Sequence, residues 1–439
     1  MAQFRTDLNK IDSGQVFTRY EVNMMSDRLT PSGTLTDAFG SLRVTQPFTL
    51  FESTHRFTDN GLWATSNTAG NSSYNFVTNQ STIDMNVGTT ANAEVIRETT
   101  RVFSYQPGKS LLIMQSLAMN TPKANLRQRA GYFGQSNGIY FENDGTTNYF
   151  VLRSNTSSTV TETRVAQSDW NVDKFDGTGY SSQLGGAEHA NGLNVSKTNI
   201  FWMDIEWLGV GDVRCGFIVD GKMIPAHIFH NDNRNTVPYM TTASLPLRLE
   251  IKNTGVTESN STLSQICSTV ISEGGYELTG SQQAVQTSVG TPVDLPTAGV
   301  YYPIISIRLK TTPNRLDAIV ILTALSILGI TNNAYYNWQV RAAADTSGGG
   351  TWVSAGDNSA VEYKLDGGSV TGGRILASGF TGATTQSISP VDILKEALFK
   401  FQLERNSLTG TPYELTLVVA ASSNGADIYG SMDWEEITR

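Results

Sequence analysis

The chain has 439 residues, a formal net charge of −9 and only 16% charged residues. Its basic residues are scattered, which argues against a nucleic-acid-binding surface, because such a surface needs clustered positive charge. No apolar run is long enough to span a membrane, and the first residues lack a hydrophobic stretch of signal-peptide length. We therefore expect a protein that is made in the cytoplasm and contacts neither nucleic acid nor membrane.

The cysteines and histidines do not form a metal-binding pattern. Cys215 and Cys267 lie far apart in apolar, strand-like surroundings, which favours two buried free thiols over a disulfide. His227 and His230 are three residues apart, so on a strand they should point to opposite faces and bind a single ion poorly. The sequence predicts no metal and no cofactor.

The first segment, residues 1–50, has few apolar anchors and several turn signals, such as the run 30–33. A segment of this kind cannot form a hydrophobic core by itself. We expect an N-terminal arm that either packs on its own domain or reaches over a partner.

Residues 51–275 alternate between apolar and polar positions with the period of β-strands, and glycine-rich turns separate the alternating stretches. About nine short strands with irregular loops predict a jelly-roll β-sandwich. The predicted hairpin at residues 207–222 resembles the back of a concanavalin-like jelly roll, which implies a sandwich of that type. The stretch 168–197 is rich in Gly, Ser and Asn and is predicted to be a long loop, of the kind that is often functional or ordered by a partner.

The clearest chemical pattern lies at residues 200–207, where the run Trp202-x-Asp204-x-Glu206 resembles the active-site strand of laminarinase-type β-glucanases, Glu-x-Asp-x-Glu. Alternation places these three side chains on one face of the strand. A retaining glycosidase needs two carboxyl groups about 5–5.5 Å apart, and the indole of Trp202 cannot act as the nucleophile. The opposite face is predicted to fill the core with Phe201, Met203, Ile205 and Trp207.

This incomplete carboxylate set predicts that the chain is not an enzyme and has no catalytic residues. Trp202, Asp204 and Glu206 remain candidates for glycan binding if their face forms an open groove. A depolymerase that combines Glu206 with Asp212 or Asp220 is the least favoured alternative. Four aromatic residues in predicted loops could stack on sugars, although packing under loops or at subunit contacts is the favoured interpretation: Trp170, Tyr180, Tyr239 and Trp352.

The last part of the chain differs in character. Residues 276–300 are rich in Ser, Gln, Thr and Val and are predicted to be a linker, and residues 301–439 are predicted to form a second β-sandwich. A helix is predicted near residues 390–403, with Ser389 as its N-cap, Pro390 in its first turn and an apolar stripe that includes Ile393 and Phe401.

Several stretches together resemble a family of virion structural proteins of tailed bacteriophages, similar to those of cyanophages. They follow one another in order at residues 37–53, 105–110, 127–133, 204–209 and 265–276. The resemblance implies a particle component that is made in the host cytoplasm and built into the virion in many copies, with no catalytic residues.

The sequence thus favours a non-enzymatic virion protein at the tail, neck or baseplate, which mounts or forms a fibre or spike. Its expected partners are other copies of itself, in a symmetric trimer or hexamer, and other virion proteins. The alternatives are an adhesin that binds host surface glycans and a capsid decoration protein.

Overall fold

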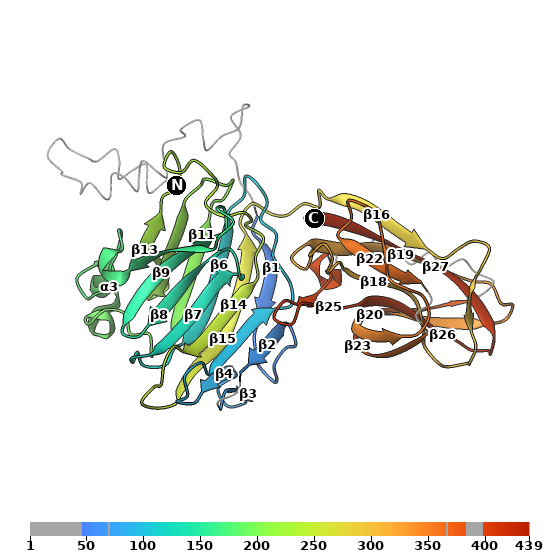
Figure 1. The fold of residues 1–439 in the computed structure, drawn as a ribbon, viewed down its shortest axis with the longest axis horizontal. Coiled ribbons are helices and arrows are strands. Elements are labelled where there is room, and N and C mark those ends of the chain that lie inside the picture. Colours follow the sequence, from blue (N-terminus) through green and yellow to red (C-terminus); the bar gives the residue numbers. More distant parts are fainter. Residues whose placement is uncertain (1–45, 69–70, 366–367, 383–397, 439) are drawn as a thin grey trace, which may run out of the picture. The chain divides into compact units, whose positions relative to one another are not determined.

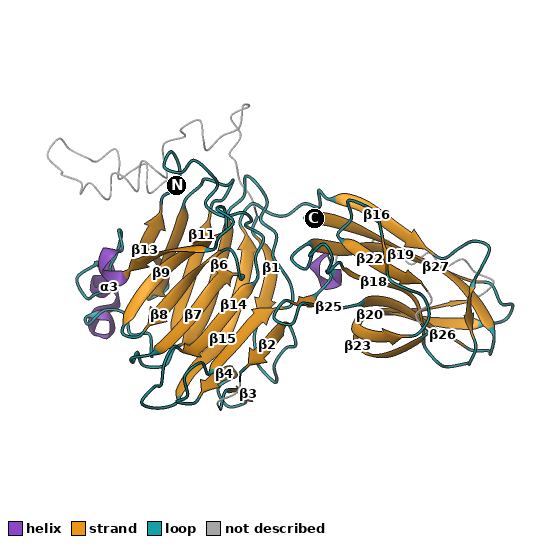
Figure 2. Cartoon of the chain, viewed as in Figure 1, coloured by secondary structure: helices purple, strands orange, loops and turns teal. Residues whose placement is uncertain are grey.

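The computed structural model describes residues 46–68, 71–365, 368–382 and 398–438 of the chain. Their secondary structure is almost entirely β (Figures 1 and 2). Residues 47–439 form one compact unit, and the predicted arm lies outside the described residues up to residue 45. Within the described residues, no helix has the length and apolar character needed to cross a membrane.

The first sandwich packs an eight-stranded sheet against a seven-stranded sheet, and most of their strands are labelled in Figure 1. The eight-stranded sheet has the order β13-β12-β11-β6-β15-β4-β3, and β1 pairs with β15. Its strands are β1 (Phe48–Ser53), β3 (Ser73–Val77), β4 (Thr82–Val87), β6 (Leu111–Ala118), β11 (Asn199–Ile205), β12 (Val213–Val219), β13 (Lys222–Phe229) and β15 (Ser261–Ser272). The first strand therefore begins at Phe48, inside the range predicted to be the arm.

The seven-stranded sheet has the order β10-β9-β8-β7-β14-β5-β2. Its strands are β2 (Trp63–Asn67), β5 (Glu94–Thr99), β7 (Leu126–Phe133), β8 (Gly138–Asp144), β9 (Thr147–Ser154), β10 (Thr161–Ala166) and β14 (Leu247–Asn253).

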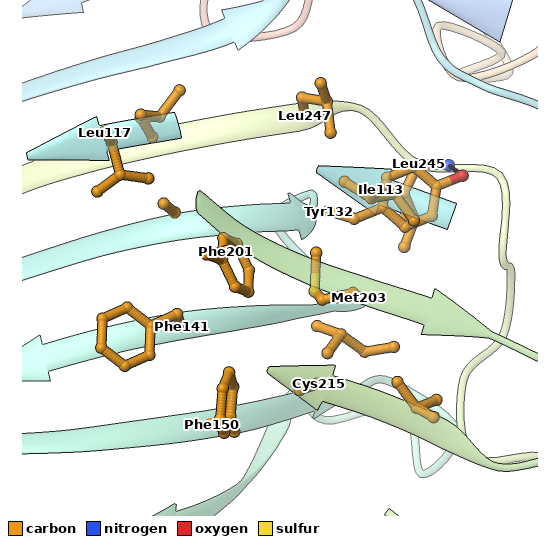
Figure 3. Packing of buried hydrophobic residues seen from close by; sticks show 14 of the residues in the cluster. Ile113, Leu117, Tyr132, Phe141, Phe150, Phe201, Met203, Cys215, Leu245 and Leu247 are labelled. Atoms are coloured by element: carbon orange, nitrogen blue, oxygen red, sulfur yellow. Dashed lines mark hydrogen bonds between the residues drawn. The ribbon is translucent and has the colours of Figure 1, made fainter. Parts of the chain in front are cut away.

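The core of this sandwich is formed by the inward side chains of both sheets. Phe201 and Met203 of one sheet meet Phe141 and Phe150 of the other, and the Phe141 and Phe201 rings lie 6.1 Å apart (Figure 3). Burial of apolar surface on this scale is the main stabilising term for a sandwich of this size. The predicted core positions of the strand at 200–207 are confirmed for Phe201, Met203 and Ile205, and Trp207 packs against the same cluster.

The outer side of the seven-stranded sheet carries a network of buried charges. Arg129 of β7 donates from Nε to Oε2 of Glu142 at 2.5 Å and from Nη1 to Oε2 of Glu250 at 3.3 Å. These residues alternate with core residues along their strands, so they lie on the face that points away from the core. Arg164 also pairs with Glu142, and Arg248 pairs with Glu250 at 2.7 Å. The network links side chains from four strands of one sheet.

The second sandwich has its own core between a four-stranded and a six-stranded sheet. The four-stranded sheet contains β16 (Ser281–Gln286), β17 (Val293–Leu295), β19 (Ile319–Gly329) and β27 (Ala426–Thr438), with β27 paired to the other three. The six-stranded sheet has the order β21-β22-β18-β26-β20-β23, and its strands are β18 (Tyr302–Leu309), β20 (Tyr335–Ser347), β21 (Val353–Ser354), β22 (Val361–Leu365), β23 (Ser369–Gly382) and β26 (Leu415–Ala421). A short hairpin adds β24 (Arg405–Asn406) and β25 (Thr411–Pro412).

The prediction of an all-β chain with a jelly-roll sandwich followed by a second sandwich is confirmed.

Three local predictions were wrong. The range 276–300, predicted to be a linker, contains β16 and β17, which pair with β27 because their apolar residues Val285, Val293 and Leu295 enter the second core. The range 168–197, predicted to be a loop, begins within the 3-10 turn η1 (Gln167–Asp169) and contains the helix α3 (Tyr180–His189), which is kinked at Gly186.

Most of the helix predicted near 390–403 lies outside the described residues. Its described end forms the 3-10 turn η2 (Leu398–Phe401).

The third wrong prediction concerns Cys267. Cys215 is buried in the core, as expected, but Cys267 is exposed. The strand β15 has an irregular register between Gln265 and Cys267, opposite β6. An extra residue in one strand reverses the faces of the residues that follow, so the alternation that placed Cys267 inside fails at this point.

Candidate functional site

The three candidate glycan-binding residues lie on or directly after β11, which runs antiparallel between β6 and β12. Because Phe201, Met203 and Ile205 point into the core, Trp202 and Asp204 point to the outer side of the eight-stranded sheet. Glu206 follows the last residue of the strand and is exposed. Trp202 and Asp204 thus share one face of the strand, whereas Glu206 lies beyond its end, and the three side chains differ in their surroundings.

Trp202 is buried, with 4% of its surface exposed. Its Nε1–H donates to the carbonyl oxygen of Phe217 at 3.2 Å, so the indole lies over the neighbouring strand β12. Gly216 is the residue of β12 directly opposite Trp202, and a side chain there would collide with the backbone oxygen of Ile224. Trp202 is thus a packing residue of the sheet in this structure, and not an open platform for a sugar ring as the prediction required.

Asp204 and Glu206 line one cavity of about 520 Å³. Asp204 is 6% exposed and pairs with Arg214, its cross-strand neighbour on β12. Burial raises the pKa of Asp204 above its usual range, and the nearby Glu273 and Glu206 act in the same direction, against the opposing effect of Arg214. The other lining residues are Tyr105, Gly108, Lys109, Ser110, Leu208, Asp212 and Arg214.

A tight turn after β11 brings Glu206 and Asp212 to this cavity. The Glu206 N–H donates to the carbonyl oxygen of Asp212 at 3.1 Å, and Gly211 N–H donates to that of Trp207 at 2.7 Å. The turn needs a positive φ at Leu208 (40°) and Gly209 (83°). Of the two carboxylates proposed as partners of Glu206, Asp212 lines the same cavity, whereas Asp220 lies at the other end of β12.

The cavity wall is polar and of mixed charge. Asp204, Glu206 and Asp212 face the cations Lys109 and Arg214, and Lys109 Nζ donates to Oε1 of Gln106 at 3.0 Å. Asp212 is further held by Nδ1 of His230 at 2.8 Å. A wall with both donors and acceptors suits hydroxyl-rich ligands. Lys109 and Tyr105 come from a distant segment, and nothing in their local sequence predicts this position.

The two histidines of the run 227–230 line a single cavity, but His227 is buried and His230 is exposed. The pairing of β13 with β12 is regular from His227 to Phe229, so the predicted alternation is not interrupted between them. Cys215 pairs with His227 and Gly216 with Pro225, so Ala226 is an extra residue in β13. This bulge turns His227 to the same side as Cys215, toward the core. Among the described residues, no group of three or more His, Cys, Asp or Glu side chains is arranged to hold a metal ion.

The four loop aromatic residues are divided between interior and surface. Trp170 and Tyr239 are 2% and 5% exposed and belong to the core of the first sandwich. Tyr180 is exposed at the start of α3. Trp352 is half-buried, with the Arg308 guanidinium 3.9 Å from its ring centre.

No protein-family model matches this sequence. No curated protein matches it either.

Among solved structures, a protein of unknown function from Shewanella oneidensis MR-1 is 13% identical, with 61% of this chain and 100% of that chain covered and a TM-score of 0.32. The CBM2 module of the evolved Dit protein of Lactobacillus casei BL23 phage J-1 is 6% identical, with coverages of 53% and 100% and a TM-score of 0.34. A Bacteroides ovatus GH16 protein in complex with a mixed-linkage glucan product is 10% identical, with coverages of 50% and 99% and a TM-score of 0.33. At these identities and TM-scores, the likenesses assign no function to this chain.

Proposed function

We propose that this chain is a non-enzymatic structural protein of a tailed-phage virion, located at the tail, neck or baseplate and present as a symmetric homo-oligomer. The virion assignment is supported by the five segments between residues 37 and 276 that resemble such proteins in the same order. It includes the expectation that the chain mounts or forms a fibre or spike.

The absence of enzymatic activity is supported by one observation at β11. Where a laminarinase-type strand carries its first glutamate, this chain carries Trp202, whose indole is buried and hydrogen-bonded to the backbone. The remaining carboxylates do not replace that nucleophile in the pattern: Glu206 stands at the place of the general acid, and Asp204, between the two places, is paired with Arg214.

The location is tested by cryo-electron microscopy of the intact particle, with this chain traced in the map. We expect density for several copies at the tail, neck or baseplate. Density on the capsid surface would contradict this location and favour the capsid decoration protein. Purified particles without this chain would refute the virion proposal. Release of sugars from β-glucans by the purified chain would refute the non-enzymatic part.

A second candidate function, glycan binding, is favoured by the cavity at Glu206. Replacing Glu206 by Gln is expected to weaken binding of a recognised glucan about tenfold, because a charged hydrogen-bond acceptor is lost. Thermal stability should stay unchanged, because Glu206 is exposed. The measurement is calorimetric titration with β-1,3- and β-1,4-linked glucan oligosaccharides.

Glu188→Gln is the matched control, since Glu188 is exposed on α3 and does not line the cavity. Equal affinity of the wild type and the Glu206 variant, or no binding by either, would eliminate glycan recognition at this cavity. A fall in stability without a change in affinity would make Glu206 a structural residue.

A further inference from the structure

A second cavity, of about 620 Å³, lies at one edge of the first sandwich. It is lined from β13, the terminal strand of the eight-stranded sheet, and from β9 and the terminal strand β10 of the other sheet. The loop 231–239 after β13 completes its wall. The cavity therefore opens where the two sheets end, away from the centre of the sheet that holds Asp204.

His227 is the buried polar group of this cavity. It is 7% exposed, and its ring packs edge-on against Phe229 with 4.6 Å between the ring centres. Its Nδ1 is buried and has no hydrogen-bond partner among the described residues. Buried polar atoms are nearly always paired, so an unpaired one at a cavity wall indicates a missing partner. Burial, and secondarily His230, lowers the pKa of His227 to about 4, so at neutral pH the ring offers one donor and one acceptor.

The cavity wall carries the guanidinium of Arg234, while the carboxylate of Asp212 contacts the wall from outside through His230. Arg234 is exposed and lines the cavity, and its guanidinium makes no ion pair with a described residue. Its Nη1 makes a weak contact with the carbonyl oxygen of His230, at 3.4 Å. No Asp or Glu is among the residues that line this cavity. An unneutralised guanidinium in such a wall selects for a planar anion, and a carboxylate can accept two of its N–H groups.

The rest of the wall offers hydroxyl and amide groups beside an apolar floor. Ser154, Thr163 and Thr236 supply hydroxyls, and Leu152 and Phe229 supply apolar contact. A sugar ring presents the same combination, with hydroxyls at its rim and C–H groups on its faces. The volume lies within the range typical of small-ligand sites.

We propose that this cavity binds the carboxylate-bearing ring of an acidic saccharide, with Arg234 paired to the carboxylate and His227 hydrogen-bonded to a ring hydroxyl. This site is separate from the Glu206 cavity. The proposal does not depend on whether the chain is a virion protein.

Calorimetric titration of the full chain tests this site, with oligogalacturonate as the probe and a neutral glucan oligosaccharide of the same length as the reference. We expect the acidic oligosaccharide to bind at least about tenfold more tightly than the neutral one. Arg234→Gln should remove most of that preference, and the fold should be retained because Arg234 is exposed. His227→Phe should weaken both ligands, since the hydroxyl contact is shared.

Lys222→Gln is the matched control, because Lys222 is exposed on β13, the strand that carries His227, and does not line the cavity. Its affinity should equal that of the wild type. The proposal is overturned if the acidic oligosaccharide binds no better than the neutral one, or if the Lys222 and Arg234 variants lose affinity equally, which would indicate unspecific attraction of charge.

Discussion

Replacing Arg129 by Met is expected to lower the free energy of unfolding of the first sandwich by about 3 kcal/mol. Arg129 is 7% exposed and pairs with Glu142, which is fully buried, and with Glu250, which is 5% exposed. Removing one member of a buried ion network leaves the other charges desolvated and less well paired. This penalty is larger than the stabilisation that the intact network gives relative to apolar residues. Equilibrium urea unfolding of the full chain measures the change.

Two further variants make this prediction specific. Lys252→Gln breaks the more exposed pair between Lys252 and Glu94 and should cost no more than about 1 kcal/mol. Adding Glu142→Leu to Arg129→Met should restore part of the lost stability, because the carboxylate left without Arg129 is removed. If the Arg129 variant is as stable as the wild type, the network does not stabilise the sheet. A double variant that is additively worse would show that the cost has another origin.

The period-two pattern of the sequence is enough to predict which side chains of a strand point into the core, as long as the register of the strand with its neighbours is regular. In β11 it correctly places Phe201 and Met203 in the core and Asp204 on the opposite face. It fails where a bulge adds a residue, as at Ala226 in β13 and beside Cys267 in β15. Each bulge reverses the faces of the residues beyond it, and a proline within the strand, Pro225, is the one local signal of such an irregularity.

The candidate sites depend on pairings between distant segments, which the local sequence does not encode. The indole of Trp202 is hydrogen-bonded to the carbonyl oxygen of Phe217 on β12, and this requires the register of β11 with β12. Lys109 lines the same cavity as Glu206 because β6, which follows Lys109, and β11 are neighbours in the sheet. The helix α3 was missed because Gly185 and Gly186 lie within it, and glycine weakens helix propensity.

Acidification from pH 7 to pH 5 is expected to lower the free energy of unfolding by about 2 kcal/mol for each of two buried histidines, His55 and His227. Burial, together with the nearby Arg97, lowers the pKa of His55 to about 4, against the opposing effect of Asp59. Burial also lowers the pKa of His227 to about 4. The ordinary value for both in the unfolded chain is 6.5.

The sign of this effect follows from proton binding. Between pH 6.5 and 4 the unfolded chain holds a proton on each of these histidines and the folded chain does not, so acid favours unfolding throughout this window. Among the carboxyl groups, Glu162 and Glu250 have pKa values below their ordinary 4.5 in the folded state, so their contribution is lost only at lower pH. Burial raises the pKa of Asp204 and of Asp433, so these two groups bind protons more readily in the folded chain and act with the opposite sign. The loss of stability above pH 5 is therefore assigned to the histidines.

Urea unfolding at half-unit steps from pH 7 to pH 5 measures this dependence, and the variants His55→Asn and His227→Asn separate the two contributions. Each single variant should have about half the pH slope of the wild type, and the double variant should have almost none, whatever its stability at pH 7. A wild-type stability that is constant over this range would show that neither ring is held neutral by the fold. A slope that persists in the double variant would place the proton uptake on other groups, because only sites with different proton affinity in the folded and unfolded chain contribute to it.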